Sequence, residues 1–285
     1  MTRIAYVNGT YLPAAEATVS IFDRGFLFAD GVYEVTAVLD GRLIDMAAHF
    51  DRLERSLRAL DMAWPVTREA LHAVHTELVA RNDLRSGGVY MQITRGVADR
   101  DFAYPADTPT TLVAFTQEKE LLDPPAARTG VAVVTMPDIR WQRRDIKSVA
   151  LLAQAMGKQA AVARGAYEGW MVEDGYVTEG TASNAFIVTA DDRVVTRPTS
   201  HNILSGVTRA ALLRLAEETP VVIEERRFTP AEAYAAKEAF LTSSSSFVMP
   251  VVRIDDHPIG NGKPGPVTQT LRRIYIEAAR DSAAA

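Results

Sequence analysis

The chain has 285 residues, of which 47% are hydrophobic and 24% charged, values typical of a globular protein with one large domain or two modest ones. Its formal net charge of -5, with no long run of either sign, argues against the basic face that nucleic-acid binding normally requires. Cysteine is absent, and no apolar run is long enough for a signal peptide or a membrane span. We therefore expect a cytoplasmic protein that binds neither nucleic acid nor membranes and has no metal site.

The first part of the chain is predicted to combine strands with helices. Asn8-Gly9 and Asp40-Gly41 are turn dipeptides that tolerate positive φ angles, so each is expected to join two strands in a hairpin. Asp45 can cap a helix whose apolar residues recur every three or four positions, and Arg52 lies just off that apolar stripe. In chain order, we predict hairpins over residues 4–12 and 32–44, helices over residues 46–60 and 67–82, and strands over residues 89–94 and 111–116.

The second part of the chain repeats this mixture after a candidate linker. Residues 119–130 include Pro124-Pro125 and several charges, which is typical of a connection between domains. We therefore predict a small α+β domain over residues 1–118, the linker, and a larger domain over residues 131–285. The elements expected after the linker are strands over residues 131–136, 185–189, 239–242 and 251–254, a hairpin around Asp174-Gly175, and helices over residues 149–164, 207–218 and 267–280.

Lys147 lies just before the predicted helix over residues 149–164, and so at its amino end. The helix dipole is positive there, and Arg143 and Arg144 add like charge, so both effects favour the neutral amine. A neutral lysine amine is a nucleophile toward carbonyl groups and forms Schiff bases. The alternative is a solvated surface lysine, and this stretch by itself favours that alternative because most lysines are solvated.

Two segments have the composition of an anion-binding site. Leu204-Ser205-Gly206-Val207-Thr208 opens a predicted helix, where backbone N–H groups, a glycine that permits close approach and a threonine hydroxyl suit a phosphate. Ser243 and Ser244 belong to a run of five hydroxyl residues flanked by apolar ones, and hydroxyls within a core need partners such as an anion. Arg52 could add a fixed positive charge. The alternatives are an ordinary helix N-cap, a solvated loop and an exposed arginine.

Glu179 ends a predicted hairpin strand and is followed by small hydroxyl residues, a geometry that can place one carboxylate in a pocket. A carboxylate that faces a heterocyclic nitrogen keeps it protonated, and a protonated pyridine ring is an electron sink. A turn glutamate in water is the alternative. A Schiff-base lysine, a phosphate site and a partner for a ring nitrogen together describe pyridoxal phosphate.

An ordered string in the second part of the chain resembles the signature of the fold type IV, or class IV, pyridoxal-phosphate aminotransferases in residue type and spacing: Glu179, Thr181, Asn184, Ala185-Phe186, Val194, Thr196, Leu204, Gly206, Val207 and Arg209. Asp145-Ile146-Lys147-Ser148 is similar to the lysine site of that family, residues 23–34 to its early motif, and His49-Phe50-Asp51-Arg52-Leu53 to its arginine helix. The resemblance covers essentially the whole chain and is greatest to the D-amino acid aminotransferases.

This resemblance implies a fold, a cofactor and a homodimer. The fold would combine a small α+β domain with a larger domain built on a barrel-like sheet flanked by helices. Lys147 would carry pyridoxal 5'-phosphate and then move the substrate proton, and a loop of the partner subunit near Arg100 would cover the active site. The other implied contacts are the pyridine nitrogen for Glu179, the cofactor and its phosphate for Arg52, Leu204, Gly206, Val207, Thr208, Ser243 and Ser244, and the substrate for Tyr33, Arg100 and Phe102.

Two positions depart from the D-amino acid aminotransferase pattern. In that family an arginine and a histidine two positions later bind the substrate carboxylate, whereas Arg100 is followed by Phe102 here. Losing one charge-assisted contact weakens carboxylate binding by about 1.5 to 3 kcal/mol, and an apolar Phe102 favours substrates without a carboxylate, such as (R)-amines. Ala182 stands where the family commonly has serine. We therefore predict a transaminase for D-amino acids and 2-keto acids with relaxed specificity.

Three alternatives remain open. A branched-chain L-amino acid aminotransferase and an aminodeoxychorismate lyase would share the fold, the lysine and the phosphate site, so only the substrate pocket separates them. Outside catalysis, the chain could bind a phosphorylated metabolite with Lys147 as a counter-ion, although Glu179 would then have no purpose near a phosphate.

Overall fold

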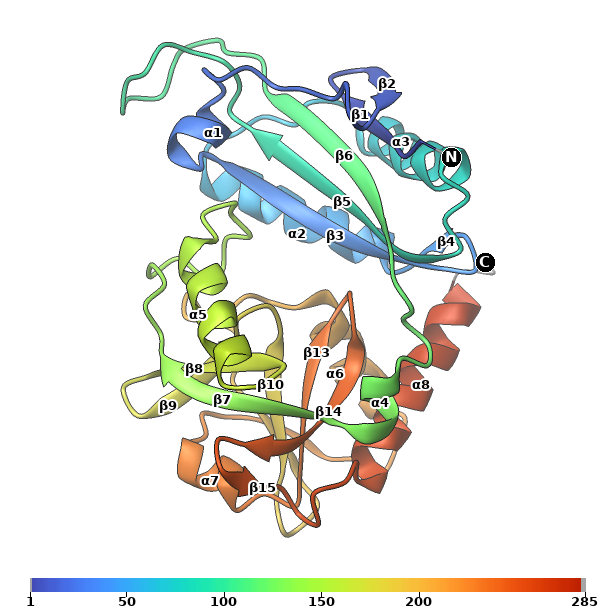
Figure 1. Ribbon diagram of the computed structural model, residues 1–285, viewed down its shortest axis with the longest axis vertical. Coiled ribbons are helices and arrows are strands. Elements are labelled where there is room, and N and C mark those ends of the chain that lie inside the picture. The colour runs from blue at the N-terminus through green and yellow to red at the C-terminus, as the bar shows by residue number, and fades with distance from the viewer. Residues whose placement is uncertain (1, 283–285) are drawn as a thin grey trace. The chain divides into compact units, whose positions relative to one another are not determined.

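The structure is a computed structural model that describes residues 2–282 of the chain (Figure 1). The chain divides into two compact units, and each is described by itself. The described residues of the first unit are 2–120, 146–150 and 282, and those of the second unit are 121–145 and 151–281.

The first unit is an antiparallel sheet covered by helices. Its strands lie in the order β2-β1-β6-β5-β3-β4, and every neighbouring pair is antiparallel. Figure 1 shows α2 and α3 against one face of this sheet. The elements are β1 (Ile4–Val7), β2 (Thr10–Pro13), α1 (Arg24–Phe28), β3 (Gly31–Leu39), β4 (Arg42–Leu43), α2 (Met46–Ala59), α3 (Arg68–Arg81), β5 (Ser86–Thr94) and β6 (Thr111–Glu118).

Turn residues in the left-handed region close the two predicted hairpins of this sheet. Asn8 and Gly9 have φ angles of 45° and 98°, and Asp40 and Gly41 have φ angles of 50° and 78°. Asparagine, aspartate and glycine tolerate this region better than other residues. Both hairpins predicted from their dipeptides are therefore confirmed.

The two long helices of the first unit begin in different ways. At the start of α3, the Thr67 hydroxyl accepts a hydrogen bond from the Ala70 amide at 3.2 Å, as expected for an N-cap threonine. Asp45 occupies the N-cap position of α2, but its φ angle is 54° and its side chain makes no cap hydrogen bond. The prediction that the Asp45 side chain caps this helix is therefore wrong.

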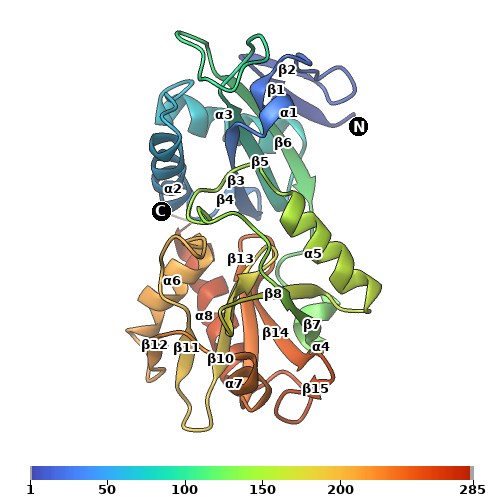
Figure 2. The ribbon, with the colours of Figure 1, turned by 90° about the vertical axis from the view of Figure 1, so that its left-hand side faces the viewer.

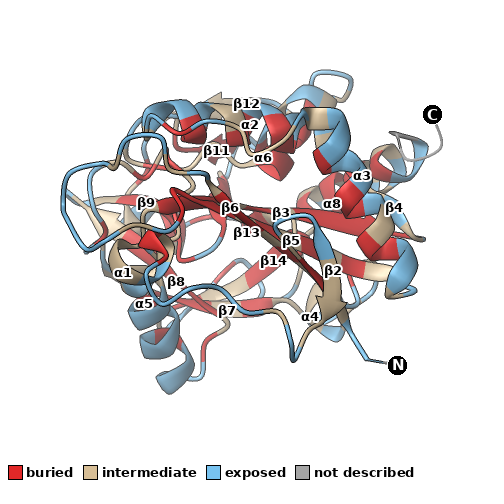
Figure 3. Ribbon diagram, turned by 90° about the horizontal axis from the view of Figure 1, so that it is seen from above, coloured by how far each residue is buried: buried red, intermediate tan, exposed pale blue. Residues whose placement is uncertain are grey.

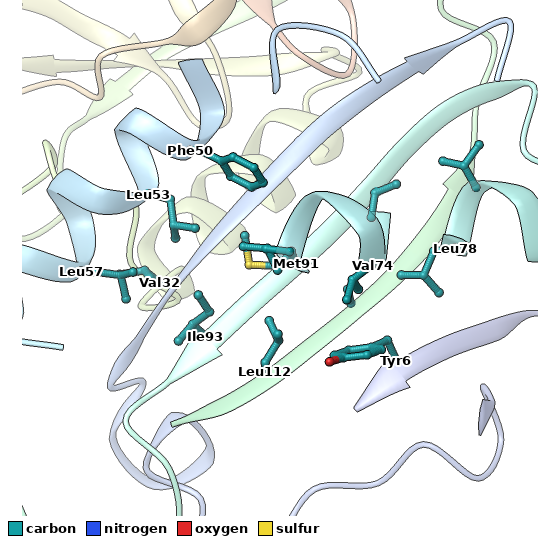
Figure 4. Packing of buried hydrophobic residues seen from close by; sticks show 14 of the residues in the cluster. Tyr6, Val32, Phe50, Leu53, Leu57, Val74, Leu78, Met91, Ile93 and Leu112 are labelled. Carbon is teal, nitrogen blue, oxygen red and sulfur yellow. The ribbon is translucent and has the colours of Figure 1, made fainter. Parts of the chain in front are cut away.

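The core of the first unit forms where α2 and α3 pack on the sheet (Figure 4). Leu53 and Leu57 of α2 meet strand residues that include Val32 and Met91, and all four are at most 1% exposed. Burying a leucine side chain contributes about 1.5 to 3 kcal/mol, so this stripe anchors α2 firmly to β3. Figure 3 shows buried central strands and exposed outer surfaces on both helices.

The second unit is a nine-stranded mixed sheet in the order β12-β11-β10-β13-β14-β7-β8-β9, with β15 paired to β14. β9 also contacts β10, so the sheet curls back on itself, which confirms the predicted barrel-like sheet and the α+β class. The elements are α4 (Pro125–Thr129), β7 (Val131–Pro137), α5 (Leu152–Ala163), β8 (Glu168–Glu173), β9 (Tyr176–Gly180), β10 (Asn184–Val188), β11 (Val194–Thr196), α6 (Val207–Ala216), β12 (Ile223–Glu225), α7 (Pro230–Tyr234), β13 (Glu238–Ser243), β14 (Phe247–Ile254), β15 (His257–Pro258) and α8 (Pro266–Ser282).

Helices flank the curled sheet, and α6 packs against β13. Figure 1 and Figure 2 both show α5 and α8 on opposite sides of this sheet. Trp170 of β8 and Phe228 are fully buried inside it, with ring centroids 6.2 Å apart in an edge-to-face arrangement. The core therefore fixes β8 and, through it, the neighbouring strands that end near Glu179.

Residues 146–150 lie between β7 and α5 in sequence but pair with the outer edge of β3. The Tyr33 amide donates to the Lys147 carbonyl oxygen at 3.0 Å, and the Val149 amide donates to the Gly31 carbonyl oxygen at 3.0 Å. This backbone pairing explains why the segment groups with the first unit, although the sequence placed Lys147 in the C-terminal domain.

The helix predicted over residues 149–164 begins later than expected. α5 spans Leu152–Ala163, so Lys147 lies five positions before its first residue. The prediction that Lys147 sits at the positive end of a helix dipole is therefore wrong. The cause is the pairing with β3, which holds the residues before Leu152 in an extended conformation that the composition does not reveal.

Candidate active site

Lys147 and Tyr33 lie together in the first unit. The Lys147 amine lies 4.1 Å from the centroid of the Tyr33 ring, within the range of cation–π attraction. The Tyr33 ring also stacks on Tyr90 of β5, with centroids 5.5 Å apart. Lys147 is half-buried, so the free surface lysine considered above does not describe it.

Glu34, the next residue of β3, points to the opposite face of the sheet from Tyr33, toward α2. It accepts hydrogen bonds from Nε and Nη2 of Arg52 at 2.7 and 2.6 Å, and its carboxylate lies 2.7 Å from Nδ1 of His49. All three side chains are buried. Burial raises the pKa of Glu34, but the Arg52 guanidinium and the His49 ring outweigh it and hold the pKa well below its ordinary value. The predicted phosphate ligand Arg52 is thus oriented by a buried carboxylate.

Arg100 and Phe102 lie on the long connection between β5 and β6, which extends beyond the ends of these strands (Figure 1). Phe102 is 78% exposed, and its ring centroid lies 5.5 Å from that of Phe28. The Arg100 guanidinium carbon lies 5.4 and 5.5 Å from the Phe28 and Phe102 ring centroids. The two predicted substrate residues therefore lie together, at the surface of the first unit.

Glu179 is buried at the end of β9 in the second unit, and it is not the solvated turn glutamate of the alternative interpretation. The Leu204 amide donates to both carboxylate oxygens at 3.1 Å, and the Asn184 side-chain amide donates to Oε2 at 2.9 Å. Nη1 of Arg140 donates to Oε1. Burial raises the pKa of Glu179, and the Arg140 guanidinium opposes this shift. Leu204, predicted to touch the cofactor, contacts Glu179 here.

Arg140 is also bound by a second buried acid. Asp138 accepts hydrogen bonds from Nε and Nη2 of Arg140 at 2.9 and 2.7 Å, and from the Thr178 hydroxyl at 2.7 Å. Asp138 also lies 3.5 Å from Arg144, whose guanidinium makes a two-pronged contact with Glu173 at 2.7 and 2.8 Å. The side chains of Asp138, Arg140 and Arg144 are at most 5% exposed. Charges therefore alternate from Glu179 outward to Glu173.

The start of α6 has the features of an anion site. Gly206 is its N-cap residue, and a Cβ at this position would collide with Oδ1 of Asn184, so only glycine fits. The Thr208 hydroxyl is buried and has no hydrogen-bond partner within residues 2–282. A buried hydroxyl without a partner costs about 1 to 3 kcal/mol, so this atom is suited to an acceptor that a ligand would supply.

The hydroxyl run predicted to bind phosphate ends β13. The Ser243 hydroxyl contacts those of Ser246 and Ser245, at 2.7 and 3.3 Å. Thr242 pairs with Asn184 across β13 and β10. Because Asn184 also meets Gly206, the end of β13, the start of β10 and the start of α6 converge within the second unit.

The arginines expected to add charge beside Lys147 are both balanced by carboxylates. Arg143 pairs with Asp145 at 3.0 Å, and Arg144 pairs with Glu173. The expectation of uncompensated like charge is therefore wrong, because sequence near Lys147 does not show which acids fold against these arginines. Its contact with Tyr33 and the family motif remain the grounds for its role.

Sequence reasoning missed Asp138, Arg140 and Glu34. Arg140 meets Glu179 only through the order β7-β8-β9, so no local pattern could have identified the pair. Glu34 did leave a signal, since it is a charged residue in phase with buried Val32 on an apolar strand. A buried charge at such a position requires a partner, and a search for one would have led to Arg52.

Two kinds of feature are absent over residues 2–282. No group of three or more histidine, cysteine, aspartate or glutamate side chains is arranged to hold a metal ion. None of the helices in this range has the length and apolar character needed to cross a membrane.

The curled mixed sheet, the lysine beside an aromatic ring, the buried carboxylate and the anion-suited helix start define an enzyme of the aminotransferase type. Residues 31–254 match the family described as amino-transferase class IV, and the chain belongs to this family of pyridoxal-phosphate enzymes. It is 38% identical to a D-alanine aminotransferase of Bacillus licheniformis, over 93% of each chain. It is 36% identical to a D-alanine aminotransferase of Staphylococcus haemolyticus, over 98% of this chain and 99% of that one.

Solved structures agree with this assignment. A branched-chain amino acid aminotransferase of the organism abbreviated T.th., solved with pyridoxamine 5'-phosphate, superposes with a TM-score of 0.90 at 27% identity, over 98% of this chain and 94% of that one. The branched-chain amino acid aminotransferase of Escherichia coli has a TM-score of 0.89 at 21% identity, over 98% and 95% of the two chains, and shows the same fold.

Proposed function

We propose that this protein transfers amino groups between D-amino acids and 2-keto acids with pyridoxal phosphate as its cofactor. The observation that carries the substrate class is the 36 to 38% identity to D-alanine aminotransferases over at least 93% of the chain. We also propose a cytoplasmic location, which the absence of cysteine supports.

The residues present fit the cofactor. The partnerless Thr208 hydroxyl and the glycine-only start of α6 suit a phosphate, and helix N-termini favour anions. Buried Glu179 suits a protonated ring nitrogen. We propose that the cofactor and its phosphate are held by Arg52, Leu204, Gly206, Val207, Thr208, Ser243 and Ser244.

When bound, pyridoxal phosphate supplies an electron sink for the substrate carbon. In this proposal Lys147 holds the cofactor through its amine and moves the proton to and from that carbon. Tyr33, whose ring lies 4.1 Å from the amine, orients it and faces the substrate. Glu179 keeps the ring nitrogen protonated, and its contacts with Arg140 and Asn184 fix its direction.

Purified protein loaded with pyridoxal phosphate tests the proposal. We expect transfer from D-alanine or D-glutamate to a 2-keto acid, and a visible absorption band that shifts on borohydride reduction. Lys147→Ala should abolish the band and lower kcat by about 10²- to 10⁴-fold, the range for losing an acid–base group. Exposed Lys158 on α5 provides the matched control, since Lys158→Ala should retain both properties.

The same assays separate the alternatives. Strict preference for L-branched-chain donors would contradict the D-amino acid class and favour the branched-chain aminotransferase. Pyruvate release without an amino acceptor would indicate the lyase. A phosphorylated-metabolite binding protein would show no visible band that depends on Lys147.

Relaxed specificity is a second part of the proposal. Phe102 offers no hydrogen bond where relatives of the D-amino acid type are expected to have histidine. Phe102→His should raise kcat/KM for D-alanine by about 10- to 100-fold, because it restores a contact worth about 1.5 to 3 kcal/mol. The rate with (R)-1-phenylethylamine, measured in parallel, should not rise. An equal rise for both donors would argue against a carboxylate contact at this position.

We propose that the protein is a homodimer in which a loop of the partner subunit near Arg100 covers the active site. The first unit supports this with a set of large apolar side chains that are 48 to 78% exposed: Val19, Ile21, Phe22, Phe26, Val97, Phe102 and Tyr104. The two segments that carry them are tied together, because the Arg24 amide donates to Gly96 and the Ala98 amide donates to Phe22. Exposed apolar patches of this kind mark protein interfaces.

Phe26→Asp provides the test of the dimer, since Phe26 is 73% exposed and a charge there disfavours burial. We expect analytical ultracentrifugation to show a dimer for the unmodified protein and a shift toward monomer for Phe26→Asp. Val222→Asp, at an exposed position of the second unit, is the control and should remain dimeric. A monomeric unmodified protein would contradict the proposal.

A further inference from the structure

The line of alternating charges behind Glu179 has a composition that its neighbours alone do not explain. Arg140 binds Glu179 with Nη1 and uses Nε and Nη2 for Asp138. A buried arginine needs only one carboxylate for charge balance. The second carboxylate is therefore a feature to be accounted for, and taking its charge out of water is costly unless it acts on something.

Charge counting indicates what Asp138 changes. Glu179 and Arg140 alone would form a neutral pair, which offers a protonated ring nitrogen no net negative charge. Glu179, Arg140 and Asp138 together carry a net charge of about -1 when all three are ionised. Thr178 donates to Asp138 at 2.7 Å and so favours its ionised form.

We infer that Asp138 is a positioning residue that acts through Arg140 to set how strongly Glu179 keeps the cofactor ring nitrogen protonated. This inference rests on the proposed role of Glu179. Asp138 acts in two ways. It fixes the guanidinium through a two-pronged contact, and it compensates the guanidinium charge so that Glu179 retains its own charge for the ring.

The remaining buried charges increase the importance of Asp138. Arg144 is balanced by Glu173, and Arg197 lies close enough to Asp138 and Arg144 to interact with both, while its Nη1 donates to the Val177 carbonyl oxygen at 3.3 Å. Without the charge of Asp138, three arginines would face two carboxylates. The field at Glu179 would then become positive and would oppose a proton on the ring nitrogen.

Nitrogen-15 NMR of the holoenzyme, loaded with pyridoxal phosphate labelled at the ring nitrogen, tests the inference. The unmodified protein should give the shift of a protonated pyridine. In Asp138→Asn, loss of that proton should move to lower pH by about one unit or more, the usual size of an effect from one nearby charge. We expect kcat to fall about tenfold, the equivalent of one pKa unit, while KM for D-alanine changes little.

Asp191→Asn is the matched control, because Asp191 pairs with Arg193 at the surface of the same unit. Its ring-nitrogen shift and kcat should equal those of the unmodified protein. Glu179→Gln is measured in parallel. A changed shift in Glu179→Gln with none in Asp138→Asn overturns the inference alone, whereas no change in either variant overturns the role proposed for Glu179.

Arg140→Lys keeps the inference testable if Asp138→Asn does not fold. Lysine retains the charge but cannot make the two-pronged contact with Asp138 while reaching Glu179. Loss of the ring proton should then move in the same direction as in Asp138→Asn, by a smaller amount. An unchanged ring-nitrogen shift in a folded, cofactor-loaded Arg140→Lys protein would overturn the inference.

Discussion

Each unit buries a carboxylate against an arginine, yet the two carboxylates have opposite acidities. The pKa of Glu34 in the first unit lies well below its ordinary value, whereas that of Glu179 in the second unit is raised. Burial is the largest effect on both groups and raises both pKa values. Arg52 and His49 outweigh it at Glu34, but Arg140 does not outweigh it at Glu179.

The difference lies in how each arginine is shared. Arg52 directs both Nε and Nη2 to Glu34. Arg140 gives Nη1 to Glu179 and its two other donors to Asp138, whose negative charge also raises the pKa of Glu179. A guanidinium shared by two acids leaves each less stabilised, so the Glu34 cluster serves structure and the Glu179 cluster can serve a ligand.

The largest effect should come from breaking the Glu34 cluster. Glu34→Ala leaves Arg52 buried beside His49 without its carboxylate, which should lower the free energy of unfolding by about 3 to 5 kcal/mol. Urea denaturation of the cofactor-free protein measures it. Glu77→Ala removes an exposed acid that pairs with Arg81 and should cost less than about 0.5 kcal/mol. A loss below about 1 kcal/mol for Glu34→Ala would mean that the cluster is not structural.

Acid should destabilise the protein through the first unit. His75 is buried on α3, and burial lowers its pKa from 6.5 to about 4, so the folded state binds its proton later than the unfolded state. Stability is therefore lost as the pH falls from 6.5 to 4, by about 3 kcal/mol in total. Glu34, whose pKa is lowered, adds a further loss below pH 4.5.

Urea denaturation at several pH values separates these two contributions. His75→Leu should remove the slope between pH 6.5 and 4, and Glu34→Gln should remove the slope below 4.5. His72→Gln changes an exposed histidine of the same helix and should leave both slopes intact. A slope that survives in His75→Leu would locate the acid sensitivity elsewhere.

Removing the carboxylate of the second cluster should cost less than removing that of the first. In Glu179→Ala the Arg140 guanidinium retains Asp138, so we expect a loss of about 1 to 3 kcal/mol in the cofactor-free protein, most of it from the unmet donors of Leu204 and Asn184. Combining Glu179→Gln with Asp138→Asn should cost more than the sum of the two single changes, because the pair shares one guanidinium. Additive losses would contradict that sharing.

The smallest effect concerns the hydroxyl at the start of α6. Thr208→Val removes a buried hydroxyl that has no partner within residues 2–282, so the cofactor-free protein should gain up to about 1 kcal/mol in stability. Affinity for pyridoxal phosphate should fall about tenfold while affinity for pyridoxal, which lacks the phosphate, stays the same. Equal losses for both ligands would argue against a phosphate contact.

The parts of the fold with a local cause were predictable from the sequence. Turn dipeptides located the hairpins at Asn8-Gly9 and Asp40-Gly41, and Thr67 located the start of α3. The family pattern identified the fold and the cofactor before any coordinates were considered. The roles carried over with that pattern, including those of Lys147 and Arg100, remain predictions.

What the sequence could not supply depends on contacts between distant segments. Nothing near Lys147 indicates that its backbone pairs with β3, and this pairing removed the helix end on which the dipole argument rested. Nothing near Glu179 indicates Arg140 or Asp138, because strand order brings them together. The electrostatic setting of a site is therefore the part of it that composition and spacing leave undetermined.

The pairing of residues 146–150 with β3 also constrains how the protein is made. A nascent chain that ends at residue 120 contains every strand of the first unit but lacks the partners of Gly31 and Tyr33 along the outer edge of β3. An unpaired edge is prone to wrong pairing with other chains, and closing it requires a contact of long sequence separation. The first unit therefore finishes folding only after the chain has been synthesised beyond β7.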